Sequence, residues 1–166
     1  MAEFGPKALV GVVVALVGGA IYLEHRSNKM KVFISFDWDH DRDYRNLLSA
    51  FAKNPKNDIN FEESTPGAID TKEIGRVKAV LTTKIREATH TLVLIGQYAN
   101  TRHHDSAEIG ALNWQWWEID KSKQEHNKLV AVKLAPAYAT PAPLLGAGAS
   151  WASYNVDSIA KALREA

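Results

Sequence analysis

Lys31-Val-Phe-Ile-Ser-Phe36 is a short run of β-branched and aromatic residues, a composition typical of a buried strand. Asp37–Asp43 (DWDHDRD) follows it directly and forms a polar loop that can cap a helix. Apolar residues at helical spacing then predict that helix: Tyr44, Leu47, Leu48 and Phe51. A strand, a polar loop and a helix in this order are the opening unit of an α/β fold.

The rest of the chain repeats this alternation. Apolar runs predict strands at 58–61, 91–95 and 128–134, and helical periodicity predicts helices at 71–87, 113–123 and 156–164. The Ala/Pro/Gly-rich segment 135–150 is expected to be a loop. These elements predict a flavodoxin-like three-layer sandwich over residues 30–166, with a parallel sheet of four or five strands. In such sheets ligands bind beyond the carboxyl ends of the strands, which places a site near 36–43, 96–105 and 133–138.

Composition excludes several classes of protein. The chain has 166 residues, 20 Lys and Arg, 19 Asp and Glu, and a formal net charge of +1. A nearly neutral domain lacks the excess positive charge of a general nucleic-acid binder, so no nucleic-acid partner is expected. The absence of cysteine excludes disulfides, thiolate zinc sites and a cysteine nucleophile.

Residues 1–29 form a separate hydrophobic segment with a short linker. The stretch from Ala8 to Leu23 contains sixteen residues without a charge, about 24 Å of helix. Extended back to Phe4 it has twenty residues with one charge, Lys7, which predicts a transmembrane helix over residues 4–23. Basic residues beyond its far end, Arg26, Lys29 and Lys31, place the main domain in the cytoplasm by the positive-inside rule.

Two alternatives to the membrane anchor stay open. The small residues Gly18, Gly19 and Ala20 have the spacing of a signal-peptide cleavage site. However, the apolar run continues past that site through Leu23. A buried core helix is the other alternative, although the predicted α/β domain is complete without one.

The most distinctive cluster of side chains is Trp114–Ile119 (WQWWEI). On a helix Trp114 and Glu118 share one face, because they are four residues apart. A carboxylate beside an indole is partly desolvated, which raises its pKa and suits it to electrostatic catalysis. The alternative is three core tryptophans and an exposed glutamate.

Metal-ligand residue types also occur in the segment that precedes this cluster. His103, His104, Asp105 and Glu108 are of the right chemical types. No second pair at the usual spacing accompanies them, so no metal site and no bound cofactor are expected.

Several segments between residues 31 and 164 match the motifs of one family, in the same order along the chain. Lys31–Phe36, the acidic loop and Asp43–Leu48 (DYRNLL) are similar to its first strand and helix. Ile85–Gly96 resembles its helix-to-strand passage, and Trp117-Glu118-Ile119 resembles its W-E-I helix. Its later motifs are matched by Lys128–Val132, Trp151 and Asn155–Ile159. The chain thus resembles TIR-like domains of the Thoeris antiphage-defence type over residues 31–164.

The resemblance implies a TIR fold and, in active members, cleavage of the nicotinamide–ribose bond of NAD. NAD is then a substrate, and the essential carboxylate corresponds to Glu118. It also implies that Phe36 and Trp38 stack on the base. The remaining substrate-binding residues that it suggests are Arg45, Ser64 and Thr65, joined by Trp114 from the spacing argument.

One feature departs from the family pattern. In the family, a short link joins the strand that ends at the equivalent of Gly96 to the W-E-I helix. In this chain the link contains twenty residues, Gln97–Trp116. Two functions are therefore expected as alternatives. The first is a membrane-anchored NAD glycohydrolase or ADP-ribose cyclase in defence signalling. The second is a non-catalytic TIR-like module that acts by self-association at the membrane, and both imply a homo-oligomer.

Overall fold

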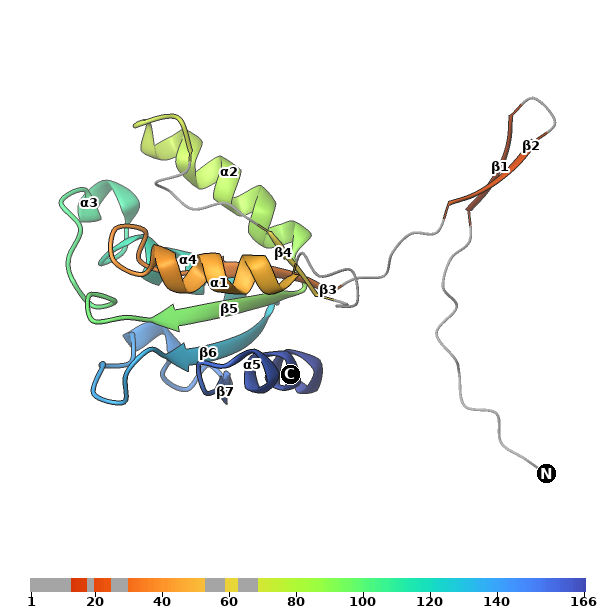
Figure 1. Cartoon of the computed structure of the whole chain (residues 1–166). Coiled ribbons are helices and arrows are strands. Elements are labelled where there is room, and N and C mark those ends of the chain that lie inside the picture. The colour runs from red at the N-terminus through yellow and green to blue at the C-terminus, as the bar shows by residue number, and fades with distance from the viewer. Residues whose placement is uncertain (1–12, 18–19, 25–29, 53–58, 63–68) are drawn as a thin grey trace.

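The computed structural model describes residues 13–17, 20–24, 30–52, 59–62 and 69–166 (Figure 1). Its main sheet has five strands in the order β4-β3-β5-β6-β7, and each neighbouring pair is parallel. The strands are β3 (Met30–Ser35), β4 (Ile59–Glu62), β5 (His90–Ile95), β6 (Lys128–Lys133) and β7 (Ser150–Ala152). This is the flavodoxin-like order, with the reversal between β3 and β5, and it confirms the predicted α/β class.

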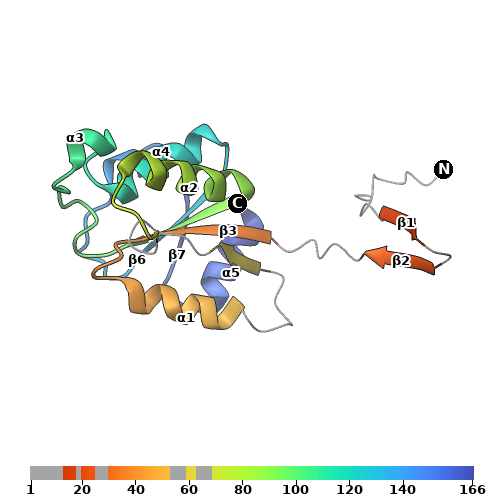
Figure 2. The same ribbon diagram turned by 90° about the horizontal axis from the view of Figure 1, so that it is seen from above.

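Helices cover both faces of the sheet. The helices α1 (Arg42–Ala52) and α5 (Val156–Glu165) lie on one face, and α2 (Ile74–Glu87) and α4 (Trp114–Gln124) lie on the other (Figure 2). Successive strand residues point to opposite faces. Ile34 and Leu92 therefore pack with Leu48 and Ile159 of the first helix pair, whereas Val93 packs with α4. The result is the predicted three-layer sandwich.

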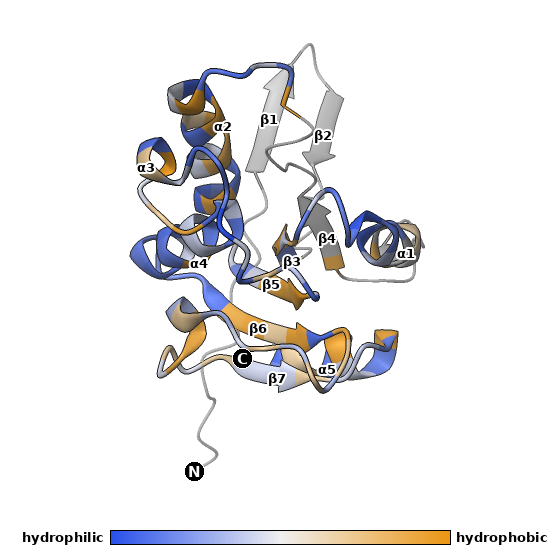
Figure 3. Cartoon of the chain, turned by 90° about the vertical axis from the view of Figure 1, so that its left-hand side faces the viewer, coloured by the Kyte–Doolittle hydropathy of each residue, from blue (hydrophilic) through white to orange (hydrophobic). Residues whose placement is uncertain are grey.

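The core lies in the strands, since both faces of a covered parallel sheet are apolar. In Figure 3, β5 and β6 are largely orange, whereas the helices that cover them mix blue and orange. Thr91 to Ile95 are all buried, as the most apolar run of the sequence predicts. On α2, Val77, Leu81 and Ile85 are the buried stripe that the sequence periodicity indicates.

Three short elements of the α/β domain were not predicted. The strand β7 contains three residues, too few to give an alternating sequence pattern. The helix α3 (Ser106–Ile109) has four residues, too few for helical periodicity. The predicted loop 135–150 contains the 3-10 helix η2 (Ala142–Leu144) and ends in the first residue of β7.

The described residues of the N-terminal segment do not form the predicted hydrophobic helix. Val13–Val17 (β1) and Ala20–Glu24 (β2) instead form a two-stranded antiparallel sheet, with Val17 opposite Ala20. The physical reason is residue type, because valine and isoleucine favour strands over helices. Residues 1–12, 18–19 and 25–29 lie outside the described residues, so most of the predicted span 4–23 is undescribed. In the part of the chain that the structure describes, no helix is long and apolar enough to cross a membrane.

Candidate functional site

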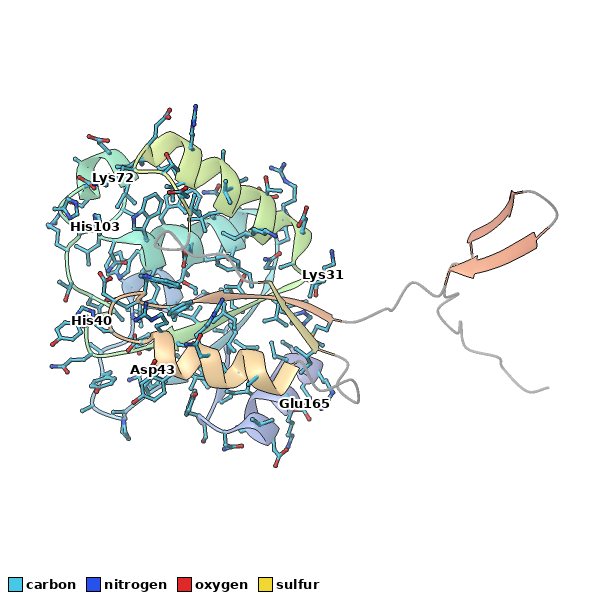
Figure 4. All side chains as sticks on the ribbon, turned by 45° about the horizontal axis from the view of Figure 1, so that its top comes forward. Lys31, His40, Asp43, Lys72, His103 and Glu165 are labelled. Carbon is cyan, nitrogen blue, oxygen red and sulfur yellow. The ribbon has the colours of Figure 1, made fainter. Side chains whose placement is uncertain are left out.

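A cavity of about 550 Å³ lies at the carboxyl ends of the strands, where the sequence places the site. Its walls come from the β3–α1 loop, the start of α2, the segment 97–105 and the first turn of α4. His40, Lys72 and His103 line it, and Figure 4 shows them at one end of the domain, away from Lys31 and Glu165.

Aromatic side chains form much of the cavity wall. Phe36, Trp38, Tyr98 and Trp114 all line it. The ring centroids of Phe36 and Trp38 are 6.1 Å apart, and the Arg42 guanidinium lies 5.3 Å from the Trp38 ring centroid. The structure therefore brings three of the predicted binding residues, Phe36, Trp38 and Trp114, to one cavity.

Glu118 is 1% exposed and lies on the buried side of α4. Its Oε2 accepts a hydrogen bond of 2.6 Å from the Ser35 hydroxyl, at the carboxyl end of β3. Burial raises the pKa of Glu118 to about 8, although the hydrogen bond from Ser35 lowers it. The buried position excludes the alternative of an exposed glutamate. Glu118 is nevertheless not among the described residues that line the cavity.

Gln115 stands one helical turn before Glu118 and is 4% exposed. Its Nε2 donates to the carbonyl oxygens of Ser35 (3.2 Å) and Leu94 (2.7 Å), which belong to the neighbouring strands β3 and β5. Gln115 lines the cavity. Sequence reasoning missed both Gln115 and Ser35, although Gln115 precedes Glu118 by three residues and thus shares its helix face.

The other predicted binding residues do not gather here. Arg45 lies on α1, donates to Asn46 Oδ1 (2.9 Å), and is not among the described residues that line the cavity. Ser64 and Thr65 lie outside the described residues.

A second buried acid, Asp41, lies in the acidic loop. Asp41 is 5% exposed. Its pKa is raised to about 6, mainly by burial and to a smaller extent by the negative charge of Asp37. A Cβ atom at Gly96 would collide with the Asp41 carboxylate. The glycine directly after β5 therefore leaves the space that this carboxylate occupies. Asp37 orders the loop, because its Oδ1 accepts from the backbone N–H groups of Asp39 (3.0 Å) and His40 (3.2 Å).

Residues 97–116, the departure from the family pattern, form one wall of the cavity. Asn113 holds this segment, since its Nδ2 donates to the carbonyl oxygens of Ala99 (3.0 Å) and Thr101 (2.9 Å). Its Oδ1 caps α4 by accepting from the Trp116 backbone N–H. The segment is thus built into the domain.

His103, His104 and Asp105 are the described residues best placed to hold a metal ion. One ligand atom from each lies within 4.8 Å of the others. However, His103 Nδ1 already accepts from the Asp105 backbone N–H (3.1 Å), and the side chain of His104 is 82% exposed. The cluster is therefore weakly preorganised for a metal.

Five parallel strands in this order, helices on both faces and a cavity at the reversal of strand order define an α/β domain of the flavodoxin-like class. Within that class, residues 33–137 match the family described as Thoeris protein ThsB, TIR-like domain. The chain belongs to this family, as the sequence resemblance predicted.

Solved structures agree with this assignment at the level of the fold. The crystal structure of a prokaryotic SEFIR domain superposes with a TM-score of 0.51 and 16% sequence identity, over 82% of this chain and 95% of that one. No curated protein matches the chain.

Proposed function

We propose that this TIR-like defence-signalling domain cleaves the nicotinamide–ribose bond of NAD, with Glu118 as the essential carboxylate. The observation that carries the proposal is a carboxyl group buried at the carboxyl end of β3, next to an aromatic-lined cavity. Family membership supports a signalling role in defence.

The cavity has the chemistry that a dinucleotide requires. Phe36, Trp38 and Trp114 offer ring faces on which a base can stack. Lys72 and Arg102 are exposed cations on the same cavity, and they can pair with a diphosphate.

In the proposed reaction the C–N bond between ribose and nicotinamide breaks, and its electron pair leaves with neutral nicotinamide. Positive charge then develops at the anomeric carbon, and the Glu118 carboxylate stabilises it. Water captures this carbon, loses a proton and gives ADP-ribose, or an internal nucleophile gives a cyclic product. Because burial raises the pKa of Glu118 to about 8, the carboxyl must lose its proton and meet the substrate when the site opens.

The test is nicotinamide release from NAD by concentrated or membrane-reconstituted protein, measured by chromatography. Glu118→Gln keeps the shape and removes the charge, so the rate should fall about a hundred- to thousandfold, which corresponds to roughly 3–4 kcal/mol. Glu108→Gln is the control, because Glu108 is exposed on α3, and it should keep most of the activity. Turnover unchanged by Glu118→Gln would contradict the assignment.

The second candidate is a non-catalytic module that signals by self-association. The observation that favours it is the closed position of Glu118, which is 1% exposed. Absence of NAD turnover in every assembled form, together with self-association that Glu118→Gln leaves intact, would replace the enzyme by this module.

We further propose membrane attachment through residues 4–23, with the TIR-like domain in the cytoplasm. This attachment requires β1 and β2 to give way to one helix in the bilayer, because a single spanning segment must pair its backbone groups within itself. Its support is the sixteen-residue uncharged run from Ala8 to Leu23. Full-length protein should resist carbonate extraction from membranes. Recovery of a mature chain that begins at Ile21 would show a cleaved signal peptide instead.

A further inference from the structure

The reversal of strand order between β3 and β5 creates a crevice at the carboxyl ends of these strands. The carboxamide of Gln115 occupies it. Its Nε2 bridges the carbonyl oxygen of Ser35 on β3 and that of Leu94 on β5, at 3.2 and 2.7 Å. A single side chain thus closes the crevice by binding both of its edges.

Glu118 is linked to this closure through Ser35. Ser35 is fully buried, and it binds Gln115 through its carbonyl oxygen and Glu118 through its hydroxyl. Gln115 lines the cavity, whereas Glu118 is not among the described residues that do. Both side chains thus bind Ser35, and of the two only Gln115 meets the cavity.

The closed arrangement leaves two buried oxygen atoms unpaired. Gln115 Oε1 and Glu118 Oε1 have no hydrogen-bond partner among the described residues. An unpaired buried polar atom costs free energy, and that free energy is recovered when the site opens to water or to a ligand that can hydrogen-bond to the atom. This cost lowers the free-energy difference between the closed and the open arrangement.

We propose that Gln115 controls access to Glu118, and that its carboxamide must leave the Ser35 and Leu94 carbonyl oxygens before any substrate group reaches the carboxyl. Gln115 is then a positioning residue for the reaction. The role of this access control in catalysis rests on the proposed function. Access to the Glu118 carboxyl, however, can be measured without NAD.

The experiment measures how readily Glu118 reacts in the full chain. A water-soluble carbodiimide with glycinamide converts accessible carboxyl groups to amides, and peptide mass spectrometry reports the rate at Glu118. Gln115→Ala removes the closure, and Gln115→Asn shortens it so that it cannot bridge both strands. In either variant the rate at Glu118 should rise by about tenfold or more, because the open population grows.

Gln124→Ala is the matched control. Gln124 lies on the same helix but is exposed, and its removal should leave the rate at Glu118 at the wild-type value. Either Gln115 variant suffices if the other fails to fold. A wild-type rate in a folded Gln115 variant would overturn the proposal.

A second measurement is the titration of Glu118 by carbon-13 NMR, with Glu118→Gln assigning the signal. The pKa of Glu118 should move from about 8 toward 4.5 in Gln115→Ala, since entering water solvates the carboxylate. An unmoved pKa would count against access control. If Glu118 reacts faster in the Gln115 variants but no form of the protein cleaves NAD, the proposed function fails and the access role stands. If the protein cleaves NAD but the reactivity of Glu118 is unchanged in the Gln115 variants, the access role fails and the proposed function stands.

Discussion

Glu118 links burial to chemistry at the scale of one residue. Its pKa is about 8 in the folded chain, against an ordinary value of 4.5, because burial disfavours the charged form. Between these pH values the folded state keeps a proton that the unfolded state releases. The group therefore favours folding fully below pH 4.5 and loses that effect as the pH rises to about 8.

The free energy of unfolding should accordingly fall with rising pH over this range, by on the order of a few kcal/mol from this group. Glu118→Gln cannot titrate, so the variant should gain stability relative to the wild type as the pH rises. Urea denaturation of both proteins at about pH 5, 7 and 9 measures the difference. The raised pKa of Asp41 acts in the same direction and cancels in the comparison. Parallel profiles would contradict the burial of Glu118.

Gly96 offers a steric prediction at the same scale. A Cβ atom there would meet the Asp41 carboxylate, so Gly96→Ala should destabilise the domain by about 1–3 kcal/mol through forced displacement of a buried group. Gly75→Ala is the matched control, because Gly75 lies in α2 with nothing within 4 Å of its added Cβ. That change should stabilise the chain by about 0.5–1 kcal/mol. Thermal unfolding of the two variants should shift in opposite directions.

At the scale of elements, the chain order of strands and helices follows from local patterns. Thr91–Ile95 and the stripe Val77, Leu81 and Ile85 carry their periodicity in the residues themselves, and both lie where the sequence places them. β7 could not be predicted this way, since its pairing with β6 gives Ser150–Ala152 their strand conformation. Hydrogen bonds to a partner strand thus define a strand that is too short to have a sequence pattern of its own.

The two asparagine caps give a paired prediction for helices. Asn113 caps α4 and also binds the carbonyl oxygens of Ala99 and Thr101, whereas the side chain of Asn155 caps α5 by accepting from Ser158. Asn155→Ala should cost about 1 kcal/mol. Asn113→Ala should cost about 2–3 kcal/mol, because two further hydrogen bonds are lost. Denaturant unfolding measures both costs, and amide exchange at residues 99–103 should rise in Asn113→Ala alone. Equal costs would mean that Asn113 acts as a cap and nothing more.

At the scale of the whole molecule, the α/β domain closes without the N-terminal segment. β3 begins at Met30, and the five strands and their covering helices all lie between residues 30 and 166. Deletion of residues 1–28 should therefore yield soluble protein that unfolds in one cooperative transition, monitored by circular dichroism. An aggregated or molten product would show that Ala8–Leu23 belongs to the core.

The sequence by itself determined the α/β class, the chain order of the long elements and the placement of Trp114–Ile119 on one helix, because periodicity and residue type are local properties. Tertiary structure decided the site. Ser35 and Glu118 are 83 positions apart along the chain, and Gln115 meets the ends of two different strands. No local sequence pattern encodes these hydrogen-bonded contacts or the burial that raises the pKa of Glu118, because each depends on how the sheet and the helix pack together.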